Sequence, residues 1–202
     1  MGAKLERRDR VTGGDARQVR SRHALHQALL ALLEEKPFDQ ITVREISARA
    51  GTGYATFFRH YPTKEALLSD VASEEIAGLL AMTVPILNDA DSLESTRTLC
   101  AHVGEHRKLW SALLAGGAAG IVRGEFIRQA RELAKTTVPV QDWLPEDLGV
   151  VYGTGGTIDL LAWWLANGEV LDPDGIAAIL HRLIIQPLVG QRLPRPAMAG
   201  AR

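Results

Sequence analysis

Apolar positions recur with the period of an α-helix along most of the chain. The first such segment predicts a helix from about Arg20 to Glu35. One face of it carries Leu25, Ala28, Leu29 and Leu32. No sustained alternation of apolar and polar positions appears, so no strand is predicted. The pattern therefore predicts an all-α protein.

Two short helices joined by a tight turn are predicted next, within QITVREISARAGTGYATFFRHYP at 40–62. Thr42 and Glu45 have the spacing of a capping box, which starts the first helix at Thr42. Gly51 can adopt the left-handed conformation that ends this helix near residue 50. The second helix has about two turns, from Tyr54, before Pro62 stops it. Two helices joined by a short turn containing Gly form a helix-turn-helix.

The second of these helices separates packing residues from contact residues. Phe57 and Tyr61 are four apart and are predicted to face the small domain, which leaves Tyr54, Thr56 and Phe58 on other faces. Aromatic and hydroxyl groups suit contacts with base edges, and the cations near the helix end suit phosphate. In the alternative interpretation Tyr54 and Phe58 are half-buried packing residues and the cations form a solvated face.

The helical pattern continues beyond Pro62. Further helices are predicted at about Thr63 to Met82, Ser92 to Val103, Arg107 to Leu114, Ile121 to Lys135, Glu146 to Asn167 and Asp174 to Leu188. The predicted breaks are Gly104, Gly116-Gly117, Val138-Pro139 and Gly168. Thr63 is a candidate N-cap, and Asp172 followed by Pro173 is a typical helix start. The first of these helices connects the small domain to a larger helical domain.

Charge is distributed unevenly between the two parts. Residues 1–65 contain 12 Lys or Arg and 8 Asp or Glu, a net of +4, and the remainder contains 11 and 16, a net of −5. A basic N-terminal part on an acidic body is expected where one end meets nucleic acid. Hydrophobic residues make up 46% of the chain but form no apolar run of 18 residues, so we expect no membrane span. We also expect a cytoplasmic location. Cys100 is the single cysteine, which excludes an internal disulfide.

The segment from Ala28 to Leu68 resembles the N-terminal domain of the TetR family of bacterial transcriptional regulators. The resemblance rests on ITVREISARAG, FFRHYP and TKEALL. The expected layout is a disordered arm at 1–19, a helix-turn-helix domain at 20–65, a ligand-binding and dimerisation domain at 66–190 and a frayed tail at 191–202. The family usually has Val and Ser where this chain has Thr52 and Gly53, so the second helix should lack its side-chain N-cap.

The resemblance implies a dimeric repressor that binds a palindromic operator in double-stranded DNA and leaves it when a small organic effector binds. It also places Lys64 beside the DNA backbone. The expected DNA-binding residues are Thr42, Arg44, Thr52, Gly53, Tyr54, Thr56, Phe58, His60 and Lys64.

The second domain has two features that bear on this function. Its last two helices are apolar on more than one side and are expected to pack against a second copy through Leu148, Tyr152, Gly155, Leu161, Trp164, Ile179, Leu183 and Ile184. All four tryptophans lie in this domain, which suits an apolar ligand pocket. The residues expected to line it are His102, His106, Trp110, Phe126, Trp143, Tyr152 and Trp163.

Two alternatives stay open at this point. In the first, the second domain binds a protein partner instead of a small ligand. In the second, the protein is an enzyme with His102 and His106 as metal ligands four residues apart. Gly104 lies between them, and neither the Glu of a zinc-protease motif nor a phosphate loop or dinucleotide fingerprint is present. We therefore expect no catalytic residues, no cofactor and no metal.

Overall fold

The computed structural model describes residues 3–87, 92–135, 144–167 and 170–189, and every regular element in these ranges is a helix. The elements are α1 (Ala3–Leu33), η1 (Phe38–Gln40), α2 (Val43–Arg49), α3 (Tyr54–His60), α4 (Lys64–Leu87), α5 (Ser92–Glu105), α6 (Arg107–Leu113), η2 (Gly116–Ala118), α7 (Ala119–Ala134), α8 (Glu146–Ala166), α9 (Pro173–Leu180), η3 (His181–Ile185) and α10 (Gln186–Val189). The all-α prediction is confirmed. The predicted breaks at Val138-Pro139 and Gly168, the pocket residue Trp143 and the tail at 191–202 lie outside the described residues.

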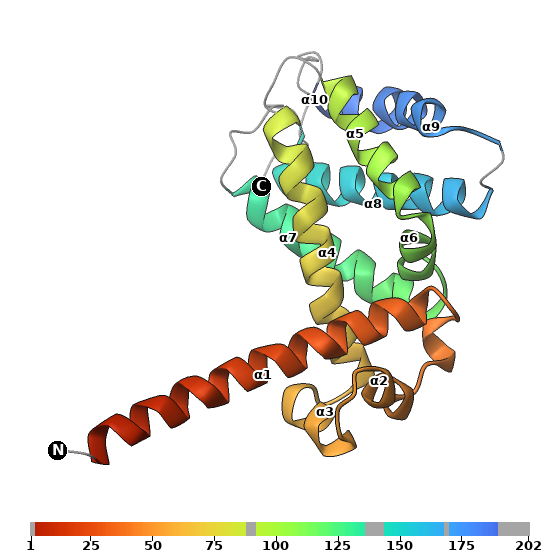
Figure 1. The fold of residues 1–202 in the computed structure, drawn as a ribbon. Helices are drawn as coiled ribbons and strands as arrows, with labels where there is room; N and C mark the ends of the chain where they lie inside the picture. Colours follow the sequence, from red (N-terminus) through yellow and green to blue (C-terminus); the bar gives the residue numbers. More distant parts are fainter. Residues whose placement is uncertain (1–2, 88–91, 136–143, 168–169, 190–202) are drawn as a thin grey trace, which may run out of the picture.

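The first helix is longer than the sequence predicts. We expected a disordered arm at 1–19, whereas α1 begins at Ala3. Figure 1 shows its N-terminal half projecting away from the other helices. Starting a helix is costly but extending it adds one hydrogen bond for each residue fixed. The C-terminal half, anchored by the buried Leu25 and Leu29, is therefore a nucleus from which the helix extends backwards.

Local sequence signals account for the helix-turn-helix. The Thr42 hydroxyl accepts from the Glu45 amide at 3.3 Å and the Glu45 carboxylate accepts from the Thr42 amide at 2.9 Å, so the predicted capping box is confirmed. Gly51 has φ of 62°, the left-handed conformation expected of it. Gly53 is the N-cap of α3 and provides no side-chain hydrogen bond, because glycine has no side-chain acceptor.

The helix α4 connects the two parts of the molecule. It runs from the cluster of α1, α2 and α3 into the larger set of helices (Figure 1). Its start is capped by Thr63, whose hydroxyl accepts from the Ala66 amide at 3.1 Å. Buried side chains such as Leu67, Leu68 and Ile76 belong to a hydrophobic core that continues from the small domain into the large one. The small domain therefore shares its core with the rest of the chain.

Two predictions in the second domain need correction. The break predicted at Gly104 falls instead at His106, between α5 and α6, and Gly104 itself lies within α5, where a Cβ would be 3.2 Å from Cη2 of Trp164. The glycine permits close packing and does not end the helix. The last helix, predicted as continuous, contains the π-helical turn η3. Pro187 follows this wider turn and has no N–H to donate to residue 183.

Asp172 caps α9 through its carboxylate, which accepts from the Gly175 amide at 2.7 Å, and Pro173 is the first helical residue. The start predicted for this helix is confirmed. Across the described ranges, no helix combines the length and the apolarity needed to span a bilayer.

Candidate nucleic-acid interface

The outward face of α3 carries two exposed aromatic side chains. Tyr54 is 58% exposed and Phe58 is 45% exposed, and their rings make an edge-to-face contact with centroids 5.0 Å apart. Thr56 is partly exposed beside them. Phe57 and Tyr61 are buried and fix the opposite face of the helix. The helix therefore has the two faces predicted from its sequence, with the contact residues on the outside.

The start of α2 and the turn extend this surface. Thr42, Arg44 and Gly53 are exposed, and Thr52 is partly buried. A groove at this position is lined by Arg44, Ser47, Ala48, Thr52 and Tyr54. In the described part of the chain the hydroxyl groups of Ser47 and Thr52 are buried without a hydrogen-bond partner. Hydroxyl donors beside an arginine suit a phosphate oxygen, because a buried donor without a partner is costly.

Sequence reasoning overlooked Ser47, because a serine within a short helix gives no distinctive signal. Its position is informative only after folding, when α2 and α3 place it in the groove with Arg44.

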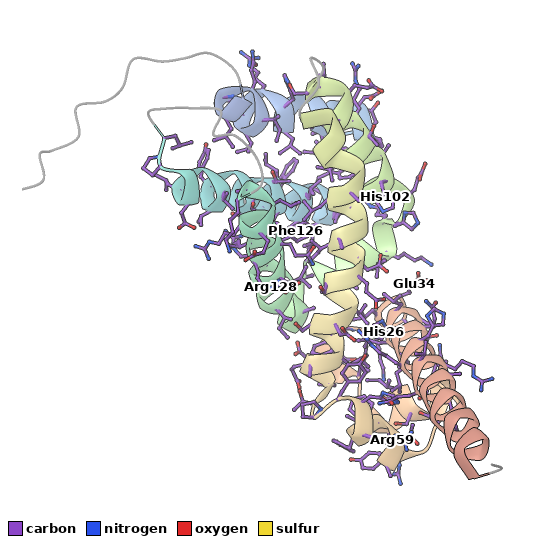
Figure 2. All side chains as sticks on the ribbon, turned by 90° about the vertical axis from the view of Figure 1, so that its left-hand side faces the viewer. His26, Glu34, Arg59, His102, Phe126 and Arg128 are labelled. Atoms are coloured by element: carbon purple, nitrogen blue, oxygen red, sulfur yellow. The ribbon has the colours of Figure 1, made fainter. Side chains whose placement is uncertain are left out.

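His60, at the end of α3, contacts α1. Its Nε2 lies 2.7 Å from the Ser21 hydroxyl. Burial lowers the pKa of His60, and the nearby charges of Arg59 and Arg22 lower it further. Arg59 is exposed beside it on the lower surface (Figure 2). Near pH 7 His60 is therefore neutral, and Arg59, absent from the predicted set, is the positively charged residue at this end of the helix.

Lys64, expected beside the DNA backbone, contacts the backbone of the protein itself. Its ammonium donates to the carbonyl oxygens of Phe38 at 3.0 Å and Ile41 at 2.8 Å, with Asp39 at 3.3 Å. It also lies 4.6 Å from the centroid of the Phe38 ring. The lysine thus fixes the segment around η1 to the start of α4. A contact with DNA phosphate would have to replace these bonds.

A polar network around the buried His26 ties α1 and the end of α3 to α4. His26 is 3% exposed, with Nε2 2.8 Å from the Tyr61 hydroxyl and 2.9 Å from Asp70 Oδ2, and Nδ1 3.0 Å from Glu74 Oε2. Arg22 adds a bidentate ion pair with Asp70 at 2.9 and 2.6 Å. Burial would raise the pKa of Asp70, but hydrogen bonds from Tyr61, Arg22 and His26 lower it. The orientation of α3 is therefore coupled to that of α4.

A second polar contact joins α4 to α7, close to this network. The amide of Gln129 donates to the Ser73 carbonyl at 2.9 Å and to Glu125 Oε1 at 2.9 Å. Arg128 makes a bidentate pair with Glu125 at 2.8 and 2.5 Å. A polar groove runs between the two sets of contacts and includes Arg59 and Arg128 among its lining residues. A displacement of α7 would therefore act on α4 next to the residues that hold α3.

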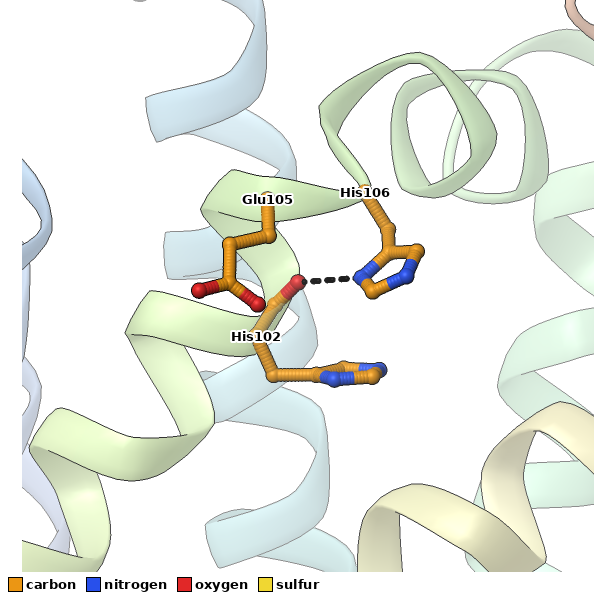
Figure 3. Close-up of side chains that lie close together, drawn as sticks. All are labelled: His102, Glu105 and His106. Carbon is orange, nitrogen blue, oxygen red and sulfur yellow. Dashed lines mark hydrogen bonds between the residues drawn. The ribbon is translucent and has the colours of Figure 1, made fainter.

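The predicted pocket residues that the structure describes do not all lie together. Trp110 and Phe126 are buried with ring centroids 6.1 Å apart, whereas Tyr152 and Trp163 are 52% and 47% exposed. His102 and His106 lie at the junction of α5 and α6 (Figure 3), with His102 partly exposed and His106 exposed. Helical periodicity alone cannot place side chains from four different helices around one cavity.

The predicted interface residues divide into two sets. Gly155, Leu161, Trp164 and Ile184 are buried within the protomer, so they pack its own core and leave little surface for a second copy. Ile179 is partly buried. The exposed set is apolar and comprises Leu148, Tyr152 and Leu183.

The arrangement is similar to known regulators. Residues 25–71 match the family model described as bacterial regulatory proteins, tetR family. A curated Bacillus subtilis (strain 168) protein, described as the uncharacterized HTH-type transcriptional regulator YxbF, is 23% identical over 178 residues, which are 83% of this chain and 47% of that protein. The chain therefore spans about half the length of this relative.

Solved structures share the fold. A TetR transcriptional regulator from Streptococcus agalactiae 2603V has a TM-score of 0.63 at 20% identity, covering 86% of this chain and 98% of its own. FadR from Thermus thermophilus, a TetR-family transcriptional repressor solved with lauroyl-CoA, has a TM-score of 0.56 at 21% identity, covering 88% and 100%. At these identities the likeness establishes the fold.

Proposed function

We propose that the chain, whose residues 25–71 match the model of the tetR family of bacterial regulatory proteins, is a dimeric transcriptional repressor that a small organic ligand releases from a palindromic operator. The observation that carries the DNA-binding part is the exposed pair Tyr54 and Phe58 on a helix anchored by the buried Phe57 and Tyr61. A short helix anchored on one side and exposed on the other can enter the major groove.

Selection of bound duplexes from a random pool, followed by anisotropy titration, tests this. Tyr54→Ala and Phe58→Ala should each weaken operator binding by about 1–3 kcal/mol, because they remove contacts to base edges. The control is Val170→Ala, since Val170 is a 65% exposed apolar residue before α9. If no duplex is enriched, or if Tyr54→Ala binds the selected duplex like the unmodified protein, the proposal fails.

Dimerisation is supported by the exposed apolar residues on α8 and η3. A chain that reads DNA with one short helix gains affinity from a two-fold partner, whose helix reaches a half-site about 34–36 Å away. The selected duplexes should therefore be palindromic, with half-sites separated by about one turn of DNA. A single half-site would count against the dimer.

A ligand response is supported by Trp110. Its indole N–H is buried without a hydrogen-bond partner in the described ranges, and the Phe126 ring lies beside it. Buried donors are ordinarily paired, so a ligand with an acceptor oxygen would satisfy this group. The effector shifts the equilibrium only if it binds the released conformation more tightly.

Compounds that raise the melting temperature and release the selected duplex identify the effector. Trp110→Phe, which keeps the aromatic ring and removes the donor, should weaken an acceptor-bearing effector. An effector that binds Trp110→Phe equally well excludes this hydrogen bond.

The second candidate function retains the DNA-binding domain and assigns the larger domain to a protein partner. The exposed Leu148, Tyr152 and Leu183 favour it if the chain sediments as a monomer, because a partner could then cover them. In either case we expect a protein without catalytic activity that acts in the cytoplasm, where its DNA lies.

A further inference from the structure

Three side chains that can bind metal meet where α5 ends and α6 begins, away from the DNA-facing surface. His102, Glu105 and His106 each offer one ligand atom, and these atoms all lie within 4.8 Å of one another. The two imidazole rings have centroids 4.4 Å apart and planes inclined by 33° (Figure 3). Residues four apart lie on one face of a helix, so the local backbone alone brings the two rings together.

The hydrogen bonding of His106 leaves one nitrogen free to bind a cation. Its Nδ1 lies 3.0 Å from the backbone oxygen of His102 (Figure 3). A carbonyl oxygen only accepts, so Nδ1 carries the proton and Nε2 keeps its lone pair. Metal-binding histidines commonly donate their second N–H to a backbone carbonyl, which fixes the ring and the tautomer. His106 is therefore oriented for coordination before any ion arrives.

We propose that His102 and His106 bind a divalent first-row transition ion such as Zn²⁺, Ni²⁺ or Cu²⁺, with Glu105 as the third ligand and water completing the shell. Imidazole nitrogen favours these ions, whereas Mg²⁺ and Ca²⁺ prefer oxygen ligands. A tetrahedral Zn²⁺ with bonds of about 2.0–2.2 Å holds its ligands roughly 3.4 Å apart. The observed ligand atoms, all within 4.8 Å of one another, must move closer to reach that spacing.

The surroundings of the three residues favour a cation. Glu105 and His106 are exposed, so an ion can enter from solvent. Glu75 on α4 acts electrostatically on His102 and adds a second negative charge from a neighbouring helix. An ion would therefore meet two imidazoles within the field of two carboxylates.

The site lies at a structural junction. His106 is the N-cap of α6, and the next residue, Arg107, donates to the carbonyls of Trp164 at 2.9 Å and Leu165 at 2.8 Å at the end of α8. An ion bound to both α5 and the start of α6 would fix this junction. Binding to the folded form alone raises the melting temperature by mass action.

The test uses the full chain without an affinity tag, dialysed against Zn²⁺ and measured by elemental analysis and calorimetry. We expect saturable binding of one ion per protomer and a higher melting temperature. His102→Ala and His106→Ala should each weaken Zn²⁺ binding at least about tenfold. Loss of a residue that only hydrogen-bonds a metal ligand already weakens binding by about this factor, and these substitutions remove the ligand itself. The matched control is His23→Ala, an exposed histidine on α1, which should bind like the unmodified protein.

Two results would overturn the site: no saturable binding of Zn²⁺, or equal binding by the variant lacking both His102 and His106. Circular dichroism without metal verifies that each variant is folded. If His102→Ala does not fold, the site is tested by comparing Zn²⁺ binding of His106→Ala with that of His23→Ala. Both of these side chains are exposed, so neither substitution should disturb the fold. Glu105→Gln should bind more weakly than the unmodified protein, and equal binding would remove Glu105 from the ligand set.

Discussion

The Lys64 ammonium contacts three backbone carbonyls of the segment between α1 and α2. A cation near the end of a recognition helix is expected to meet phosphate, and the family resemblance places it there. In the folded chain the nearest acceptors belong to the protein itself. Hydrogen bonds to a charged donor stabilise more than neutral ones, and unpaired carbonyls are costly. At the residue scale, Lys64 therefore acts first as a structural anchor.

Lys64→Ala should accordingly lower the free energy of unfolding by about 1–3 kcal/mol. The slope of operator affinity against salt concentration should stay unchanged, whereas the loss of one phosphate contact would change it by about 0.9. Urea denaturation and titrations at several salt concentrations measure the two effects. Lys108→Ala, at an exposed position on α6, is the control. If Lys64→Ala leaves the free energy of unfolding unchanged and makes the salt dependence of operator affinity less steep, Lys64 contacts DNA phosphate instead.

At the element scale, close contact between α5 and α8 depends on Gly104. A Cβ at this position would lie 3.2 Å from Cη2 of Trp164 and 3.4 Å from Cγ of Pro173. Trp164 is 1% exposed and its indole N–H donates to the Leu171 carbonyl at 2.8 Å, so the ring has little room to move. Alanine is usually preferred to glycine within a helix, but at position 104 its methyl group would press against the Trp164 ring.

Gly104→Ala should destabilise the protein, by about 1 kcal/mol or more, because overpacking outweighs the helix-propensity gain. Gly124→Ala is the matched control, since no atom lies within 4 Å of its Cβ position and it is exposed on α7. That change should stabilise the protein by roughly 0.5–1 kcal/mol. Thermal or urea denaturation measures both variants. If Gly104→Ala stabilises the protein as much as Gly124→Ala does, the Trp164 ring can move to make room for the added methyl group.

Glu125 supports the α4–α7 contact, because it accepts from Gln129, which also donates to Ser73 of α4. Hydrogen bonding from Arg128 lowers the pKa of Glu125 to about 2 against the opposing effect of burial, from 4.5 in the unfolded chain. A carboxyl group whose folded pKa is lowered stabilises fully above the unfolded pKa, and this contribution is lost as the pH falls through the folded one. The contribution is therefore complete near neutral pH and disappears between about pH 4.5 and pH 2.

Glu125→Gln should cost about 1–3 kcal/mol of unfolding free energy at pH 7, because Arg128 loses its charged partner. The difference from the unmodified protein should shrink below pH 4.5 and vanish near pH 2. Urea denaturation at a series of pH values measures it. Glu34→Gln, at an exposed position after α1, is the control. A pH-independent difference would mean that the ionised carboxylate is not what stabilises the contact.

At the scale of the whole molecule, the exposed apolar residues of α8 and η3 lie away from the surface that we propose faces DNA. Leu148 and Leu183 are each 54% exposed, Tyr152 is 52% exposed and Trp163 is 47% exposed, on α8 and η3. Figure 1 places α8 and the adjoining α9 at the end of the molecule opposite α2 and α3. A two-fold contact through this surface would leave both recognition helices free.

Leu183→Glu should convert the proposed dimer to a monomer, because an unpaired charge buried in an interface costs several kcal/mol. Sedimentation velocity measures the assembly, and operator affinity should fall with it. Val19→Glu, at a 67% exposed position on α1, should leave the assembly unchanged. A Leu183→Glu protein that remains dimeric would place the interface elsewhere.

The contacts of α4 provide a route by which the two parts of the molecule could be coupled. Its residues Asp70 and Glu74 bind α1 and α3, and Ser73 between them binds Gln129 of α7. These contacts lie within about one helical turn of each other, where a helix is stiff. A ligand that moves α7 would thus act on α4 beside the groups that orient the recognition helix.

The sequence alone determined the features that depend on neighbouring residues. The Thr42 capping box, the left-handed Gly51, the Asp172 cap and the two faces of α3 follow from spacings of a few residues, where the backbone fixes which groups can meet. The tertiary structure decided what depends on residues distant in sequence. The acceptors of Lys64, the separation of the expected pocket residues and the burial of Trp164 follow from how whole helices pack, and local periodicity does not encode that packing.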